Sequence, residues 1–142
     1  MQKLEIGKGR VIRNGEEVAI LTIGHPGNFA VEACNDLKKE GFLPAHYDLR
    51  FVKPLDSKLL HEIFSQFKKI ITVEDACIMG GFGSAVAEFM IDNNYSAAIT
   101  RLGIPDRFIE HGEQKELYNE CHFDAEAIKN AVRKLVGESV LA

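Results

Sequence analysis

Four small residues, Gly80, Gly81, Gly83 and Ser84, separate an apolar run from an amphipathic one. Glycines in such a place can leave backbone N–H groups free to face an anion at a helix N-terminus. The spacing matches neither phosphate-binding fingerprint, because Val86 stands where a dinucleotide loop has a third small residue and no Lys-Ser or Lys-Thr pair follows. These four residues are a candidate anion-binding or packing loop, and we favour close packing of a helix start on a sheet.

A second group of polar residues, Asp106, Arg107, Glu110 and His111, lies in a stretch rich in turn formers. A carboxylate beside an imidazole can raise the proton affinity of the ring, so Glu110 and His111 could work as an acid and base pair. Adjacent residues rarely converge on one substrate atom. We therefore expect these four residues to form an interface.

Other familiar chemistry is incomplete. His61 and Glu62 lack a zinc protease's second histidine, because Ser65 stands there, and Ser84 is outside a G-x-S-x-G elbow. The histidines have no recurrent metal spacing, and the three cysteines are far apart. We assign no catalytic, cofactor-binding or metal-binding residue.

The elements that must position these residues alternate along the chain. Strand-like runs cover residues 10–13, 18–23, 45–49, 70–73 and 97–102, and helical spacing of apolar residues covers 29–40, 57–67, 82–92, 114–121 and a last stretch after residue 124. Asp56 and Asp124 are the expected N-caps. The dipeptide Asn14-Gly15 predicts a hairpin that makes the first strand antiparallel to the second.

This alternation predicts an α/β fold: three layers, α/β/α, around a mixed five-stranded sheet that is mostly parallel. Ligands and partners of such a sheet meet the loops at the carboxyl ends of the strands. These loops are residues 24–28, 49–56, 74–83 and 102–113, and they include Arg50, Glu74 and Asp75.

Composition predicts one globular domain over residues 1–142, because 46% of the residues are hydrophobic and 27% are charged. A net charge of -4 gives no basic surface for nucleic acid. No apolar run approaches the length of a membrane helix. We expect a cytoplasmic protein whose cysteines stay reduced.

Three stretches resemble the C-terminal domain of 1-deoxy-D-xylulose-5-phosphate synthases: DLRFVKPLD (48–56), VED followed by GGFGSAV (73–75 and 80–86), and LGIPDRFIEHG (102–112). The first two also resemble the wider transketolase C-terminal domain, found in transketolases and in the beta subunits of 2-oxoacid dehydrogenases. The third points to the synthases.

The resemblance implies a fragment of a longer transferase that condenses pyruvate with glyceraldehyde 3-phosphate in isoprenoid and thiamine biosynthesis. Those enzymes use thiamine diphosphate and magnesium, held by the two preceding domains through a Gly-Asp-Gly motif. This chain contains no Asp-Gly dipeptide. We expect no cofactor on the fragment and a role in docking to the remaining domains and supporting a homodimer. The alternatives are a regulatory anion- or nucleotide-binding domain and the C-terminal domain of another transketolase-family enzyme.

Overall fold

The computed structural model describes residues 6–77, 81–104 and 123–141. Its sheet has five strands in the order β1-β3-β2-β4-β5. The strands are β1 (Arg10–Arg13), β2 (Val18–Thr22), β3 (Ala45–Asp48), β4 (Lys69–Cys77) and β5 (Ala98–Ile104). The helices are α1 (Pro26–Lys39), α2 (Ser57–Gln66), α3 (Phe82–Asp92) and α5 (Ala125–Leu141).

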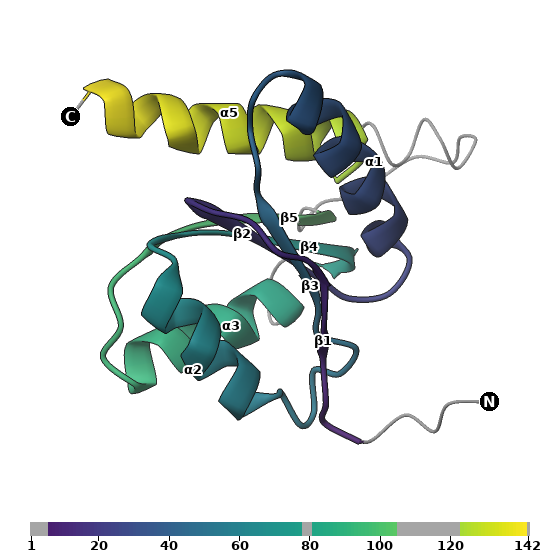
Figure 1. Cartoon of the computed structure of the whole chain (residues 1–142). Helices are drawn as coiled ribbons and strands as arrows, with labels where there is room; N and C mark the ends of the chain where they lie inside the picture. Colours follow the sequence, from purple (N-terminus) through teal and green to yellow (C-terminus); the bar gives the residue numbers. More distant parts are fainter. Residues whose placement is uncertain (1–5, 78–80, 105–122, 142) are drawn as a thin grey trace.

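Helices cover both faces of the sheet, with α1 and α5 on one face and α2 and α3 on the other (Figure 1). Alternate residues of a strand point to opposite faces, so Ile20 packs in the core under α1 and α5 while Leu21 packs in the core under α2 and α3. All five residues of β2 are buried, as expected for a strand between two covered faces. The predicted three-layer α/β fold with a mixed five-stranded sheet is confirmed.

The helix boundaries follow local signals. The carboxylate oxygen Oδ1 of Asp56 accepts a hydrogen bond from the Leu59 amide at 3.0 Å. The same oxygen of Asp124 accepts one from Ala127 at 2.9 Å, so both predicted N-caps are confirmed. Helix α1 starts at Pro26, three residues before the predicted start, because the fixed φ of proline suits the first helical turn.

The strand β1 is antiparallel, as predicted, but its partner is β3 and not β2. The hairpin prediction was wrong because both sides of β2 are taken by parallel strands, β3 and β4. Residues 14–17 instead carry the chain across the start of β3, where the Glu16 amide donates to the Leu43 carbonyl at 2.7 Å. A Cβ on Gly15 would lie 2.4 Å from the Leu43 carbonyl oxygen, so the glycine permits this crossing.

The strand predicted at 97–102 runs from Ala98 to Ile104. The helix predicted at 114–121 lies outside the described residues. Among the helices that the structure describes, none is both long and apolar enough to cross a membrane.

Candidate functional site

The carboxyl end of β4 is organised around one buried carboxylate, Glu74, which is 1% exposed. Its Oε1 accepts a hydrogen bond from the Phe82 amide at 2.9 Å, and its Oε2 accepts one from the Gly83 amide at 2.7 Å. Both amides belong to the first turn of α3, where backbone N–H groups have no partner within the helix. The chain therefore supplies its own anion to this helix N-terminus, and an external anion would have to displace Glu74.

Burial and hydrogen-bond donors act in opposite directions on the pKa of Glu74. Burial raises the pKa of Glu74, because desolvation penalises the charged form, while the amides of Gly83 and Phe82 and the Arg101 guanidinium act to lower it. Arg101 also donates from Nη1 to the Ser84 hydroxyl at 3.0 Å. The predicted loop residue Ser84 is thus bonded to a side chain of β5.

The glycine at position 83 sits where a side chain has no room. A Cβ there would lie 2.6 Å from Oγ1 of Thr72 and 3.1 Å from the side chain of Arg101. Among the described residues, Thr72 Oγ1 is buried without a hydrogen-bond partner. This geometry matches the packing alternative for the glycine loop, which brings the start of α3 against β4 and β5.

A second polar group lies beside β3. The buried side chains of Thr22 and His46 are hydrogen-bonded, with Oγ1 and Nε2 2.8 Å apart. The other ring nitrogen of His46 has no partner within the described part of the chain. The pKa of His46 is lowered from 6.5 to about 4, mainly because burial penalises the charged ring; the negative charge of Asp48 acts to raise it, and the positive charges of Arg13 and Arg10 act to lower it. His46 is therefore a neutral ring in the folded protein at pH 7.

The loop after β3 contains a residue, Arg50, whose backbone conformation is unfavourable for an L-amino acid with a side chain. Arg50 has a φ of 61°, in the left-handed region. Its amide donates to Oδ1 of Asp48 at 3.0 Å, and the other oxygen of Asp48 is 3.4 Å from Nε of Arg10. The carboxylate of Asp48 thus holds the start of this loop and ties it to β1.

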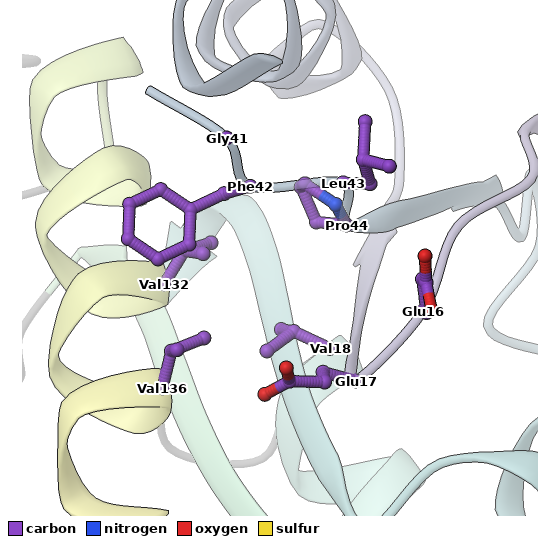
Figure 2. Close-up of a pocket in the computed structure, with 9 residues that line it drawn as sticks. All are labelled: Glu16, Glu17, Val18, Gly41, Phe42, Leu43, Pro44, Val132 and Val136. Atoms are coloured by element: carbon purple, nitrogen blue, oxygen red, sulfur yellow. The ribbon is translucent and has the colours of Figure 1, made fainter. Parts of the chain in front are cut away.

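A cavity of about 160 Å³ lies at the opposite end of the sheet, between α5 and the amino ends of β2 and β3. Phe42, Val132 and Val136 gather on one side, and Glu16 lies on the other (Figure 2). Sites for small-molecule ligands usually occupy about 300 Å³ or more. The cavity is too small for a nucleotide or a coenzyme, and the sequence analysis did not identify it.

The structure separates the predicted site residues. Gly81, Gly83 and Ser84 lie at the start of α3, with Glu74 beneath them. Gly80 and the four predicted interface residues, Asp106, Arg107, Glu110 and His111, lie outside the described residues. Sequence reasoning placed Glu74 in the loop predicted at 74–83 and missed its role, whereas the structure places it inside β4, which continues to Cys77. The available signal was an acidic residue that follows an apolar run, eight positions before a helix start.

Thiamine diphosphate would need oxygen ligands for its magnesium ion. In the described ranges, no group of three or more His, Cys, Asp or Glu side chains could hold a metal ion. The glycine-rich helix start has two of its amides bonded to Glu74. The described residues do not fit the coenzyme.

Residues 7–128 match the family model described as "Transketolase, C-terminal domain". The chain belongs to the transketolase C-terminal domain family. It is 60% identical over 136 residues to the 1-deoxy-D-xylulose-5-phosphate synthase of Cytophaga hutchinsonii, covering 96% of this chain and 21% of that protein. It is 51% identical over 134 residues to the synthase of Parabacteroides distasonis, covering 94% and 21%. The chain thus spans 21% of the length of these relatives.

Solved structures show the same transketolase C-terminal domain fold. A chain described as "Split gene transketolase, inactive beta4 tetramer" superposes with a TM-score of 0.85 at 30% identity, over 96% of this chain and 43% of that one. The transketolase of Campylobacter jejuni shares the fold, with a TM-score of 0.62 at 18% identity over 90% of this chain and 18% of that one. In this chain, the Glu74 cap and the glycine-rich helix start lie within the matched transketolase C-terminal domain.

Proposed function

We propose that this chain is the C-terminal domain of a 1-deoxy-D-xylulose-5-phosphate synthase and serves that enzyme as a docking and dimer-supporting domain. The observation that carries the proposal is the 60% identity to such a synthase over 96% of this chain. In this proposal residues 1–142 form a single domain, and pyruvate, glyceraldehyde 3-phosphate, thiamine diphosphate and magnesium are bound by the remaining domains. The complete enzyme works in the cytoplasm as a homodimer.

The internal chemistry of the carboxyl edge supports a scaffold role. Glu74 is buried, and both of its carboxylate oxygens accept hydrogen bonds from amides at the start of α3. His46 is also buried, and its ring is neutral at pH 7. Neither group is exposed for proton transfer to a substrate in solution. Large apolar side chains remain at the surface, including Ile91 on α3 at 68% exposure and Val11 on β1 at 50%. In the proposed docking role, other domains of the complete enzyme cover these side chains.

The docking role is tested by mixing this chain with the separately expressed remainder of the synthase. We expect the two polypeptides to co-purify and to restore formation of 1-deoxyxylulose 5-phosphate from pyruvate and glyceraldehyde 3-phosphate. The double substitution Arg107→Ala and Glu110→Ala in the proposed interface should weaken the association. The matched control is Glu32→Ala with Lys39→Ala on the exposed side of α1, which should leave it unchanged. If the unsubstituted polypeptides fail to associate, the docking role is wrong.

A further inference from the structure

One carboxylate joins two parts of the domain that are far apart in sequence. Asp56 caps α2 through Oδ1, and its Oδ2 accepts a hydrogen bond from the Gly9 amide at 2.9 Å, across 47 positions of sequence. The side chain is 7% exposed, so water competes little for either oxygen. Asp56 thus holds the segment that leads into β1 against the start of α2.

The leading segment, residues 6–9, lies close against the domain, and its two glycines leave no room for a side chain. A Cβ on Gly9 would lie 2.8 Å from the Asp48 carbonyl oxygen and 2.9 Å from Cδ2 of Leu59. Gly7 has a φ of +75°, and a Cβ there would lie 2.9 Å from Cγ of Pro54. Larger side chains at these two positions would push the segment away from the domain. Ile6, the first described residue, is 79% exposed.

We propose that Asp56 is a positioning residue that makes residues 6–9 a rigid joint and thereby fixes the orientation of this domain relative to the rest of a complete synthase. The inference rests on the proposed function, in which further domains are joined to this one. A flexible linker would let the domain sample many orientations, whereas a joint held by a buried carboxylate restricts it before docking begins. Preorganisation of this kind lowers the entropic cost of docking.

Hydrogen exchange on this chain tests the joint directly. Asp56→Asn keeps an oxygen for the Leu59 amide but turns an NH₂ group toward the Gly9 amide. We expect the Gly9 amide to exchange at least about tenfold faster, since a hydrogen bond to a charged group is lost. The first turn of α2 should stay protected. Gly9→Ala should release the same segment without touching the cap, and Asp124→Asn, at the cap of α5, is the matched control. Unchanged protection of the amide at position 9 in both test variants would overturn the joint.

The effect of the joint on the complete enzyme is tested in two formats: with this domain joined to the rest of the subunit, and with this domain supplied as a separate polypeptide. In the complete subunit, Asp56→Asn should open the leading segment to limited proteolysis and lower kcat/KM several-fold. When the chain is supplied as a separate polypeptide, the same variant should bind the remainder as tightly as the unsubstituted chain. Equal losses in both formats would show that Asp56 acts by general stability, against the proposal. Failure of the unsubstituted chain to bind at all would refute docking, while fast Gly9 exchange in Asp56→Asn would still establish the joint.

Discussion

At the scale of single residues, the Glu74 carboxylate accepts hydrogen bonds from the first amides of α3, as a bound phosphate does at other glycine-rich helix starts. Its two oxygens occupy the amides of Phe82 and Gly83, and the positive end of the α3 dipole favours a negative charge in this place. Burial acts against that charge and raises the pKa of Glu74. A side chain of the protein itself therefore accepts hydrogen bonds from these two amides. For this reason we favour a packing role for the glycine-rich loop over an anion-binding role.

Substitution of Glu74 measures this internal cap. Glu74→Ala leaves two buried amides without an acceptor, at about 1–3 kcal/mol each, so we expect the free energy of unfolding to fall by about 2–6 kcal/mol. Urea denaturation at pH 7 measures the loss. The control is Glu88→Ala on the exposed side of α3, with an effect within about 0.5 kcal/mol. Equal effects of the two substitutions would mean that Glu74 is not the cap on which α3 depends.

The buried ring of His46 predicts a loss of stability in acid. Its pKa falls from 6.5 to about 4 on folding, so between these values the unfolded chain binds a proton that the folded chain does not. The free energy of unfolding therefore decreases as pH falls from 6.5 to 4, by up to about 3 kcal/mol from this group. Glu74 contributes the opposite slope, because its pKa is raised.

Chemical denaturation at pH 7, 5.5 and 4.5 separates the two contributions when it is repeated on His46→Gln. The variant should lose stability at pH 7, since the bond to Thr22 changes, but it should lose less on acidification than the unsubstituted chain. Identical acid slopes would show that His46 is not the titrating group.

At the scale of elements, the decisive feature is how the chain passes from β1 to β2. A tight hairpin would need a free edge on β2, and the sheet leaves none. The connection instead packs Gly15 on the backbone of residues 43–45, and Glu17 adopts a φ of 66° to enter β2. The edge strand β1 has a register shift between Val11 and Arg13, a device that discourages pairing with other chains.

A pair of glycine substitutions tests this crossing. Gly15→Ala places a methyl group 2.4 Å from three backbone atoms, so either β1 or the start of β3 must move, at about 3 kcal/mol. Gly41→Ala meets nothing within 4 Å and suffers only from its φ of +89°, at about 1 kcal/mol. Thermal or urea unfolding of the two variants gives the comparison. A smaller effect at Gly15 than at Gly41 would contradict the crossing.

At the scale of the whole molecule, helices cover both faces of the sheet, and the interior on each side is apolar. Apolar clusters fill both sides of the sheet, and the cavity of about 160 Å³ lies away from the loops that end the parallel strands. The described part has no group of acidic, His or Cys side chains that could hold a metal ion. In the proposed division of labour, the other domains bind the coenzyme.

This division predicts how the chain responds to the coenzyme. Thiamine diphosphate with magnesium, added at millimolar concentration, should shift the melting temperature of this chain by less than about 1 °C, because binding stabilises only a protein with a site. The complete synthase, measured in parallel, should show a clear upward shift. A large shift for this chain alone would place a coenzyme site on it and refute the proposal.

The sequence by itself determined what depends on near neighbours: the strands and helices in the described part and the caps at Asp56 and Asp124. Periodicity and capping act within a few residues, so they are readable from a linear string. Only the tertiary structure decided that β1 pairs with β3, that Glu74 serves the amides of α3, and that Asp56 holds Gly9. Each of these joins groups that the sequence separates, and the choice among possible partners is made when the whole core packs.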